Sequence, residues 1–597
     1  MASSIMGKSP VRQDAALSPI PLNSMHTTTG DFFRWDVVKM THMVPRDAIS
    51  FSSDSFVESG PNPFPINGSF TYGQHAFFCP SRLVWKDWKF YYTELQSGLT
   101  EPYFTLADLW TVFNDTSVST LAQDADLRAH GMKYVSNMDR ISAVYRFLHE
   151  SSLSDIPQEW QVFKLSAIPL RACNRIWFDW MRDKLHISDN ALSSYCLDTG
   201  GHISLQELEL LCSPRWRNYP KNIFTSCFDN PQDGAAASAP GNLPSVSENP
   251  GMVPPVSGQT AIYANTTGSV GISTSGPANG NDVISSTSIN QIRWNNSIQQ
   301  YRERLLVAGK TVISRCLALL GVSPTIEELQ MSNWLGGKDF DLKPQSQSAS
   351  ASAANSQQSW SSVGSFGYPP QTATVLGQKS ASIVSPEGMG LSNISYRTDE
   401  TGYFVVMGAI TPNVQYYQGL SKNWTAGLDT FRSDKFDFFH SDMENQPFDP
   451  ILFYEICCSP LIKPKNVFGF GFMYQRYKED YDSLGGDYVM PQGATIRDLM
   501  SLGRDVEDLV DNVATDSSLD PNVVLTPALL RQASLYDLRQ YDGKFTIMQS
   551  SVDHFNVNHK FKINALRPMQ LFCLPSLDSS LSAQTPKDVI DTGGFTV

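Results

Sequence analysis

The sequence lacks the short motifs by which common enzymes and metal sites are recognised. Its 10 His include no H-E-x-x-H and no H-x-H, no G-x-S-x-G occurs, and its 9 Cys form no C-x-x-C pair. An odd number of scattered cysteines disfavours a disulfide framework and a structural zinc site. We therefore predict no catalytic residues, no metal ligands and no cofactor, although the plentiful Asp and Glu leave a glycosidase-type carboxylate pair open.

Long apolar runs are also missing. No stretch approaches the length of about 18 apolar residues that a membrane-spanning helix requires. The first residues, MASSIMGKSPVRQDAALSPIP, contain no apolar segment of the kind found in signal peptides. We therefore expect no membrane insertion, and a chain that is made and kept in a reducing cytosol.

Charge is sparse and of the wrong sign for a general nucleic-acid binder. The chain has 45 Lys and Arg against 59 Asp and Glu, a net charge of −14, so only a local basic patch could bind a polyanion. Charged residues make up 17% of the chain, below the usual ~25%. With 36 Pro, 39 Gly and 11% aromatic residues, this composition favours loop-rich β structure over helical bundles. A length of 597 residues suggests about four domains, or one large all-β domain with long insertions.

Strand-like sequence frames the chain at both ends. From Phe32 to about Tyr92, short apolar and β-branched runs alternate with Pro, Gly and Asn, a pattern typical of β-strands. In Phe555–Ala565, apolar residues alternate with Asn and Lys, which predicts a half-buried antiparallel strand. Residues 1–30 are polar and rich in Pro and Ser, so we expect an extended arm there.

One amphipathic helix is predicted over Pro169–Asp183. Ala172, Ile176 and Trp180 recur at a spacing of four residues, and Pro169 suits the first helical turn. We expect this helix to pack beside the β structure with Trp177 and Trp180 buried. Shorter helix candidates lie between residues 101 and 160.

A second, longer helix is predicted from about Ile289 to Leu320. Ser288 and Gln291 resemble a capping box, and Gly321 is a natural C-terminal stop. We expect Tyr301 and Leu305, which lie on its apolar face, to be buried.

The tripeptide Gly309-Lys310-Thr311 resembles the end of a phosphate-binding loop. Arg304 stands where that pattern requires Gly, and the tripeptide is expected in mid-helix, where backbone amides are already bonded. We therefore disfavour an ATP site.

Two segments have too little apolar content to fold alone. Residues 235–288 carry two charged residues and residues 345–385 carry one, among Gly, Pro, Ser, Ala, Asn, Thr and Gln. Each is expected to be a long surface excursion or an arm that a neighbour orders.

Basic residues alternate with aromatic ones in two places, Arg82–Lys89 and Arg215–Lys221. Aromatic rings beside cations hold single-stranded nucleic acid, but the same pattern arises when rings pack inside and cations reach the solvent. We favour packing for both, and keep the second stretch as the candidate DNA contact. Its candidate residues are Arg215, Trp216, Arg217, Tyr219 and Lys221.

The remaining candidate side chains have ordinary structural explanations. His554 and His559 are five residues apart and are expected on opposite faces of a strand, as surface or hydrogen-bonded histidines. Cys457 and Cys458 are expected in a strand, with one of them facing the core.

Several short phrases follow one another along the chain in an order that is informative as a set. The first are His26-Thr27-Thr28-Thr29, Val44-Pro45-Arg46-Asp47 and Phe77-Phe78-Cys79-Pro80-Ser81-Arg82-Leu83-Val84-Trp85. Then come the helix from Pro169 to Asp183 and Phe224-Thr225-Ser226-Cys227 with Pro231-Gln232. The last are Ile289-Asn290-Gln291-Ile292-Arg293, Trp334-Leu335-Gly336-Gly337, Gly402-Tyr403, Tyr416-Tyr417-Gln418-Gly419, Val467-Phe468-Gly469-Phe470 and Arg567-Pro568-Met569.

This ordered set resembles the major capsid protein of the Microviridae, and most closely its gokushovirus-like branch. That family usually has V-P-G-D where this chain has Val44-Pro45-Arg46-Asp47, so we expect this turn to differ.

The resemblance implies an eight-stranded antiparallel jelly roll with long insertions that contain a few helices. It implies a structural protein, not an enzyme, whose pentamers assemble into a T=1 icosahedral shell around circular single-stranded DNA. We expect a single domain over residues 31–580 after the arm at 1–30, with a helix-containing insertion at about 100–330 and a C-terminal tail at 581–597. Within it, 235–288 would be a protruding variable loop and 345–385 a Ser/Gln/Ala-rich loop.

The same resemblance implies partners and a location. The partners are further copies of the chain, the DNA genome, a scaffolding protein and a small basic DNA-packaging protein of the same virus, and a host cell-surface receptor. The expected location is the virion, assembled in the bacterial host cytoplasm.

Two other classes of function stay open. A β-sandwich lectin or carbohydrate-active enzyme would use aromatic residues such as Trp216 and Trp360 as sugar platforms. A cytosolic nucleic-acid-binding protein is disfavoured by the net charge of −14.

Overall fold

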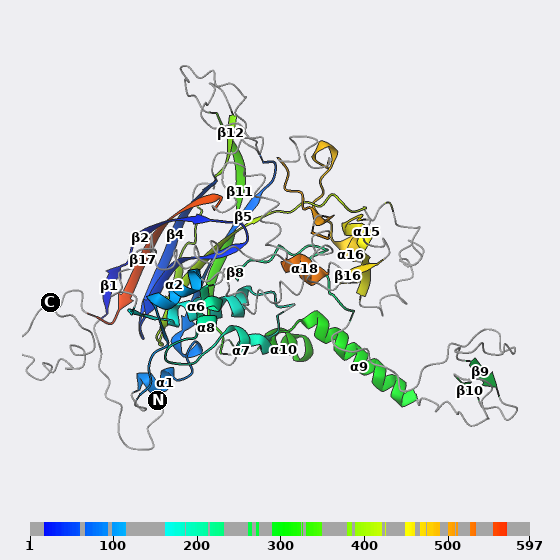
Figure 1. Ribbon diagram of the computed structural model, residues 1–597, viewed down its shortest axis with the longest axis horizontal. Helices are drawn as coiled ribbons and strands as arrows, with labels where there is room; N and C mark the ends of the chain where they lie inside the picture. Colours follow the sequence, from blue (N-terminus) through cyan, green and yellow to red (C-terminus); the bar gives the residue numbers. More distant parts are fainter. Residues whose placement is uncertain are drawn as a thin grey trace, which may run out of the picture.

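The computed structural model is built mainly from antiparallel β-strands, with short helices in the connections between them (Figure 1). The described residues are 17–59, 66–93, 98–114, 162–231 without 186 and 213–214, 261–264, 270–273, 289–348 without 324 and 326–329, 379–420 without 385–388, 424, 448–459, 466–510 without 473–474, 490–499 and 508, 526–532, and 553–569. Within these ranges, no helix is long and apolar enough to cross a membrane.

One group of strands is centred on the C-terminal strand β17 (Phe555–Arg567). This strand lies between β2 (Ser24–Gly30) and β4 (Ala48–Ser59), and β4 pairs on its other side with β13 (Ile394–Arg397). The short strand β1 (Ser18–Pro21) also pairs with β17. Residues 18–21 and 24–30 of the expected extended arm are therefore strands of the sheet.

A second group is centred on β14 (Gly402–Pro412). It lies between β3 (Arg34–Met43) and β5 (Phe70–Pro80), and β5 pairs in turn with β11 (Asn333–Ser348). The expected strands from Phe32 are thus confirmed as far as Pro80, whereas Ser81–Leu83 is a 3₁₀ turn and Trp88–Tyr92 is a helix, so the strand expectation is wrong for that end of the segment. The two groups are joined through β12 (Lys379–Val384), which pairs with both β11 and β4.

The main core lies where apolar side chains from the two groups meet. Phe51 of β4 and Phe561 of β17 pack in one cluster with Phe78 of β5 and Phe404 of β14. A second cluster joins residues of β4 and β17 to residues of β5, β11 and β14. The alternation predicted for 555–565 is confirmed, because every second side chain from Phe555 to Ala565 is buried and those between are exposed.

The helix predicted at 169–183 covers the other side of the β14 group. It forms α6 (Ile168–Ile176) and continues as a π-helical turn over Trp177–Met181. Ile176 and Trp177 pack against Phe77 and Met407. Trp177 is buried as expected, whereas Trp180 is half-buried at the edge of the same cluster.

The long helix expected at 289–320 is two helices. α9 (Ile289–Ala308) ends at Gly309, whose φ of +85° breaks the helix, and Thr311 caps the start of α10 (Val312–Leu320). Gly309-Lys310-Thr311 therefore forms the junction and does not lie in mid-helix. The stop at Gly321 is confirmed by its left-handed conformation, and Ser288 lies outside the described residues.

The expected burial of Tyr301 and Leu305 is wrong. Tyr301 is 50% exposed and Leu305 is only half-buried. The 3–4 spacing of apolar residues correctly indicates an amphipathic helix, but α9 extends away from the body of the subunit (Figure 1), so its apolar side has no core to face.

The flanks of the two low-complexity segments are partly described. β9 (Ala261–Ala264) and β10 (Val270–Ser273) pair within 235–288. The first and last residues of 345–385 belong to β11 and β12, which pair with each other, so this segment begins and ends in a two-stranded ribbon. The rest of both segments lies outside the described residues.

Short elements fill the connections. The 3₁₀ turns are Ser81–Leu83, Asp189–Ala191 and Gly486–Val489. The short helices are α1 (Trp88–Tyr92), α2 (Leu106–Asn114), α7 (Leu192–Tyr195), α8 (Leu205–Cys212), α15 (Phe453–Ile456), α16 (Gln475–Lys478) and α18 (Pro527–Gln532). The short strands are β6 (Tyr103–Thr105), β7 (Lys164–Ser166), β8 (Arg215–Trp216), β15 (Phe448–Leu452) and β16 (Val467–Phe472). Helix α2 confirms one of the helix candidates at 101–160; residues 115–160 lie outside the described residues.

The two candidate histidines are both buried. His554 precedes β17 and bonds through Nδ1 to Asp31 Oδ1 at 2.9 Å, and His559 on the buried side of β17 bonds to Ser55 Oγ at 2.8 Å. They are hydrogen-bonded histidines, as expected, but neither faces solvent. Cys457 is buried and Cys458 exposed, as expected of the pair, although both follow α15 and are not in a strand.

The turn at 44–47 places a non-glycine residue in a glycine-type conformation. Arg46 has a φ of +74°, in the left-handed region that costs an L-residue ~1–2 kcal/mol. Asp47 holds the turn, since its Oδ2 accepts from Val44 N at 3.1 Å while Arg46 N donates to Thr398 O at 2.8 Å. Arg46 therefore sits in a turn that a glycine would adopt without strain, and the expected difference from the family's turn stays a prediction.

We predict that Arg46→Gly stabilises the subunit. Glycine adopts the left-handed conformation without strain, which should raise the free energy of unfolding by about 1 kcal/mol. The greater entropy that glycine gives the unfolded chain reduces this gain. Urea denaturation measures the change. Arg46→Ala is the control, because it removes the guanidinium and keeps the left-handed strain. If both variants changed the free energy of unfolding equally, backbone strain would not be the cause.

We predict acid sensitivity from His559. Burial, with a smaller effect from His26, lowers the pKa of His559 to about 3. The unfolded chain binds this proton below about pH 6.5 while the folded chain does not, so acid favours unfolding. The free energy of unfolding should fall by up to ~1.4 kcal/mol per pH unit between about 6.5 and 3 from this residue. His559→Gln should flatten the pH dependence of the free energy of unfolding that urea titration measures.

Candidate functional site

The candidate DNA-contact stretch begins in β8, which pairs with β3 through Trp35↔Arg215 and Arg34↔Trp216. Arg215 is 6% exposed. Its guanidinium donates to Asn174 Oδ1 and to Leu210 O, and it stacks over the Trp177 ring at 4.6 Å. Arg215 therefore links the α6 region to the sheet from inside the protein.

The aromatic residues of the stretch are also internal. Trp216 and Tyr219 belong to the cluster between the two strand groups, and the Tyr219 ring lies 4.5 Å from that of Phe33. The guanidinium of Arg504 stacks on Tyr219 at 4.0 Å. Burial of Trp216 removes it as a sugar platform, and Trp360 lies outside the described residues.

The two remaining cations differ in exposure. Arg217 is half-buried, bonds to Asp339 Oδ1 at 3.1 Å and lies over Trp35 at 5.3 Å. Lys221 is exposed. The fold thus brings four of the five residues into its packing and leaves Lys221 at the surface; the contact of this stretch with DNA stays a prediction.

Lys221 lies on the wall of a cleft of about 590 Å³. The cleft has aromatic walls that include Tyr219, Phe472 and Tyr481, and its polar side carries three carboxylates, Glu479, Asp480 and Asp482. These three carboxylates outnumber the single lysine, so phosphate is not attracted to this cleft. We call it the acidic cleft.

The other basic and aromatic stretch, Arg82–Lys89, is held by packing as expected. Trp85 is fully buried among the residues that contact α6. Arg82 pairs with Glu400 at 2.6 Å near the surface.

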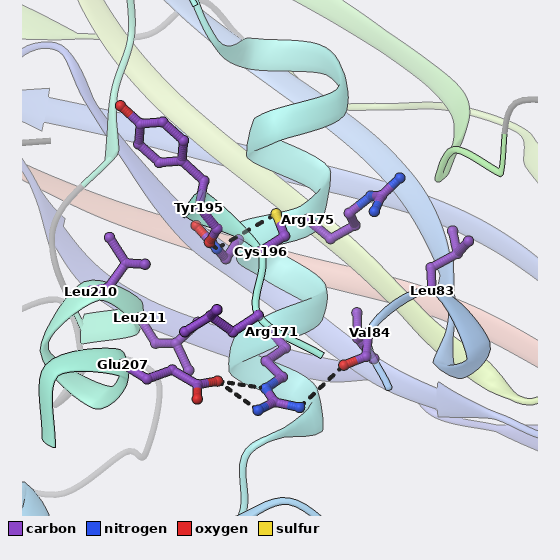
Figure 2. Close-up of a pocket in the computed structure, with 11 residues that line it drawn as sticks. Leu83, Val84, Arg171, Arg175, Tyr195, Cys196, Glu207, Leu210 and Leu211 are labelled. Carbon is purple, nitrogen blue, oxygen red and sulfur yellow. Dashed lines mark hydrogen bonds and ion pairs between the residues drawn. The ribbon is translucent and has the colours of Figure 1, made fainter. Parts of the chain in front are cut away.

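Helix α6 carries buried ion pairs that sequence reasoning missed. Arg171 contacts Glu207 of α8 at 2.6 Å and donates to Val84 O at 3.2 Å (Figure 2). It also donates to Thr199 O at 2.7 Å. Both partners are less than 5% exposed. The available signal was the appearance of two arginines, Arg171 and Arg175, within an otherwise apolar helix.

Arg175 repeats the arrangement one turn later. It pairs with Asp179 at 3.0 Å, and Asp179 accepts from the backbone and the hydroxyl of Ser332 at 2.8 and 2.9 Å. The charges on α6 therefore fasten three distant segments to the face of the sheet.

A small cavity between these residues has a volume of about 10 Å³, enough for about one water molecule. Cys196 lines it, and burial raises the pKa of this thiol to about 12. The thiol is protonated at neutral pH and is a poor nucleophile. Among the described residues, no group of three or more His, Cys, Asp and Glu is arranged to hold a metal ion.

The charged groups around α6 are thus used for internal structure within a mainly β fold. The chain belongs to the capsid protein (F protein) family, whose sequence model matches residues 149–577. It is 24% identical to capsid protein VP1 of Bdellovibrio phage phiMH2K over 507 residues, 78% of this chain and 83% of that protein. It is also 24% identical to capsid protein VP1 of Spiroplasma virus 4 over 428 residues, 66% of this chain and 68% of that protein. The resemblance to the Microviridae major capsid protein is confirmed.

We predict that Glu207→Gln destabilises the subunit by ~3 kcal/mol, because Arg171 is left buried without its charge partner. The double variant Arg171→Met/Glu207→Leu should recover most of this loss, since no charge then stays buried. Urea denaturation of all variants measures the change in the free energy of unfolding. Arg82→Gln is the control at an exposed pair and should cost less than ~1 kcal/mol. Equal losses at the two pairs would contradict the role of burial.

Proposed function

We propose that this chain is the shell-forming subunit of a small single-stranded DNA bacteriophage and that its core is an eight-stranded jelly roll. One sheet has the strand order β2-β17-β4-β13, and the other has the order β3-β14-β5-β11. If these eight strands are numbered 1 to 8 in chain order, the two sheets read 1-8-3-6 and 2-7-4-5. This interleaved order is the observation that carries the proposal, because two Greek keys wound together give a jelly roll.

The rest of the chain is assigned as insertions into this domain. In the proposal, residues 31–580 form one domain, and the segments at about 100–330 and 345–385 supply lateral contacts. Pentamers then close a T=1 shell through repeated use of the same contacts. The names of the two relatives, both capsid proteins, support a role in assembly.

The shell is proposed to enclose single-stranded DNA. A subunit with a net charge of −14 does not neutralise a genome by itself. Burial of Arg215 and pairing of Arg217 leave little free positive charge in the candidate stretch. We therefore assign most of the neutralisation to counterions and to a small basic packaging protein, with assembly in the host cytoplasm guided by a scaffolding protein.

The acidic cleft keeps a carbohydrate-active enzyme as the second candidate function. Its paired carboxylates and aromatic walls are the groups that glycoside hydrolysis uses. The family assignment favours the structural, non-enzymatic role.

Particle size separates the two functions. The purified protein should form particles of several megadaltons, visible by negative-stain microscopy and by sedimentation. A small soluble oligomer that hydrolyses oligosaccharides, and loses that activity in Asp480→Asn/Asp482→Asn, would instead establish the enzyme.

We predict that residues 235–288 project from the outer surface and act in host attachment. Deleting about 40 residues there should leave shells intact and reduce adsorption to host cells, because surface loops tolerate change and carry binding functions. Adsorption assays on purified particles measure the effect. Loss of soluble subunit would show that the segment belongs to the core or to an essential interface.

A further inference from the structure

The segment 289–322, which contains α9 and α10 and which we call the helical arm, exposes many apolar side chains. Its large exposed residues are Trp294, Tyr301, Val307, Val312, Leu317, Leu319, Leu320 and Val322. Trp294 is 67% and Leu320 is 74% exposed. Apolar surface concentrated in one element of a folded subunit marks a contact surface.

The helical arm also has the opposite charge to the rest of the chain. It contains Arg293, Arg302, Arg304, Lys310 and Arg315 and one acid, Glu303, so its net charge is 5 − 1 = +4. Since the whole chain carries −14, the remainder carries −14 − 4 = −18. Electrostatic attraction therefore favours contact between the arm and the body of a subunit, and it disfavours contact between two arms.

The base of the arm is fixed to its own subunit. Val312 N, at the start of α10, donates to Asp189 Oδ2 at 2.8 Å, and the same carboxylate pairs with Arg182. A carboxylate at a helix N-terminus is favoured by the helix dipole. The break at Gly309 then lets α9 leave the body in a different direction (Figure 1).

The acidic cleft has the properties that would receive such a helix. Phe472 is 41% exposed beside Tyr481 and next to the carboxylates Glu479, Asp480 and Asp482, so the cleft offers aromatic surface and negative charge together. Val307, near the inner end of α9, borders the cleft of its own subunit. From there α9 runs outward (Figure 1), and Trp294 and Tyr301, which lie farther along it, are both at least half exposed.

We propose that the helical arm of each copy docks into the acidic cleft of the next copy. Trp294 and Tyr301 lie against the aromatic wall, and the exposed Arg293 and Arg304 face the carboxylates of the cleft, Asp480 and Asp482 among them. Because arm and cleft are different surfaces of one chain, the contact is head-to-tail and closes into a ring when repeated by rotation. The inference rests on the proposed shell function, and it names one of the contacts that build the shell.

Cross-linking from the arm tests the docking directly. A photoreactive phenylalanine analogue replaces Tyr301 in an equal mixture of isotope-labelled and unlabelled subunits, and assembled particles are irradiated and digested. We expect cross-links between differently labelled copies that join residue 301 to peptides spanning 472–482. Cross-links to another arm, to DNA, only within one copy, or none at all would overturn the proposal.

Charge exchange tests the electrostatic part. Arg293→Glu/Arg304→Glu, two exposed positions of α9, should raise the subunit concentration needed for assembly by at least about tenfold, with unchanged melting temperature. Adding Asp480→Lys/Asp482→Lys should restore assembly. The control is Lys560→Glu/Lys562→Glu, which changes the same amount of charge on the exposed side of β17. It should not change the subunit concentration needed for assembly.

The outcomes separate the two levels of inference. The docking would be overturned if the arm variant and the Lys560/Lys562 control raised the assembly concentration equally, or if the charge exchange did not restore assembly. Normal particles of the unaltered protein would still support the shell function in either case. Failure of the unaltered protein to form particles at any concentration would instead overturn the proposed function.

Discussion

The structure depends on the pairing of the last described strand with two of the first. β17 lies between β2 and β4, with Phe561 opposite Ser24 on one side and Ser53 on the other. More than 500 residues separate these partners in the chain. Such long-range pairing is entropically costly to form and typical of slow-folding β proteins. The burial of alternate side chains along β17 offsets this cost and fixes the register, because a shift by one residue would turn Asn and Lys into the core.

The connections between the strands pack onto these sheets, and buried arginines make many of the contacts that hold them there. Arg215 fastens β8 to the helix that contains Asn174, and Arg171 fastens the same helix to α8. Arg531 of α18 pairs with Asp183 at 2.9 Å and donates to the backbone of Cys227. Irregular segments expose many backbone carbonyls, and a guanidinium with five donors satisfies several of them while pairing with one carboxylate. These contacts add charged links to connections that also bury apolar clusters of their own.

The insertions also explain how an acidic chain can present opposite charges in different places. The cations of α6 are buried in ion pairs inside the subunit, whereas the helical arm exposes Arg293, Arg304 and several large apolar side chains. Aromatic walls and carboxylates meet in the cleft beside residues 479–482. In the proposed docking these two surfaces satisfy each other between copies, which is how a head-to-tail contact of a single chain closes into a ring.

The sequence by itself determined the β class, the strands at both ends, the helix at 168–181 and the capsid family, because period-two burial, turn residues and ordered motifs are local properties of the chain. The tertiary structure alone decided which apolar faces find a core. Trp177 and Tyr301 lie on equally regular helical stripes, yet the first packs on the sheet and the second faces solvent. It also decided that Arg215 and Trp216 are internal and Lys221 external, since that depends on the pairing of β8 with β3. Spacing along a helix or strand fixes the side on which a residue lies, but only the path of the whole chain fixes what lies opposite that side.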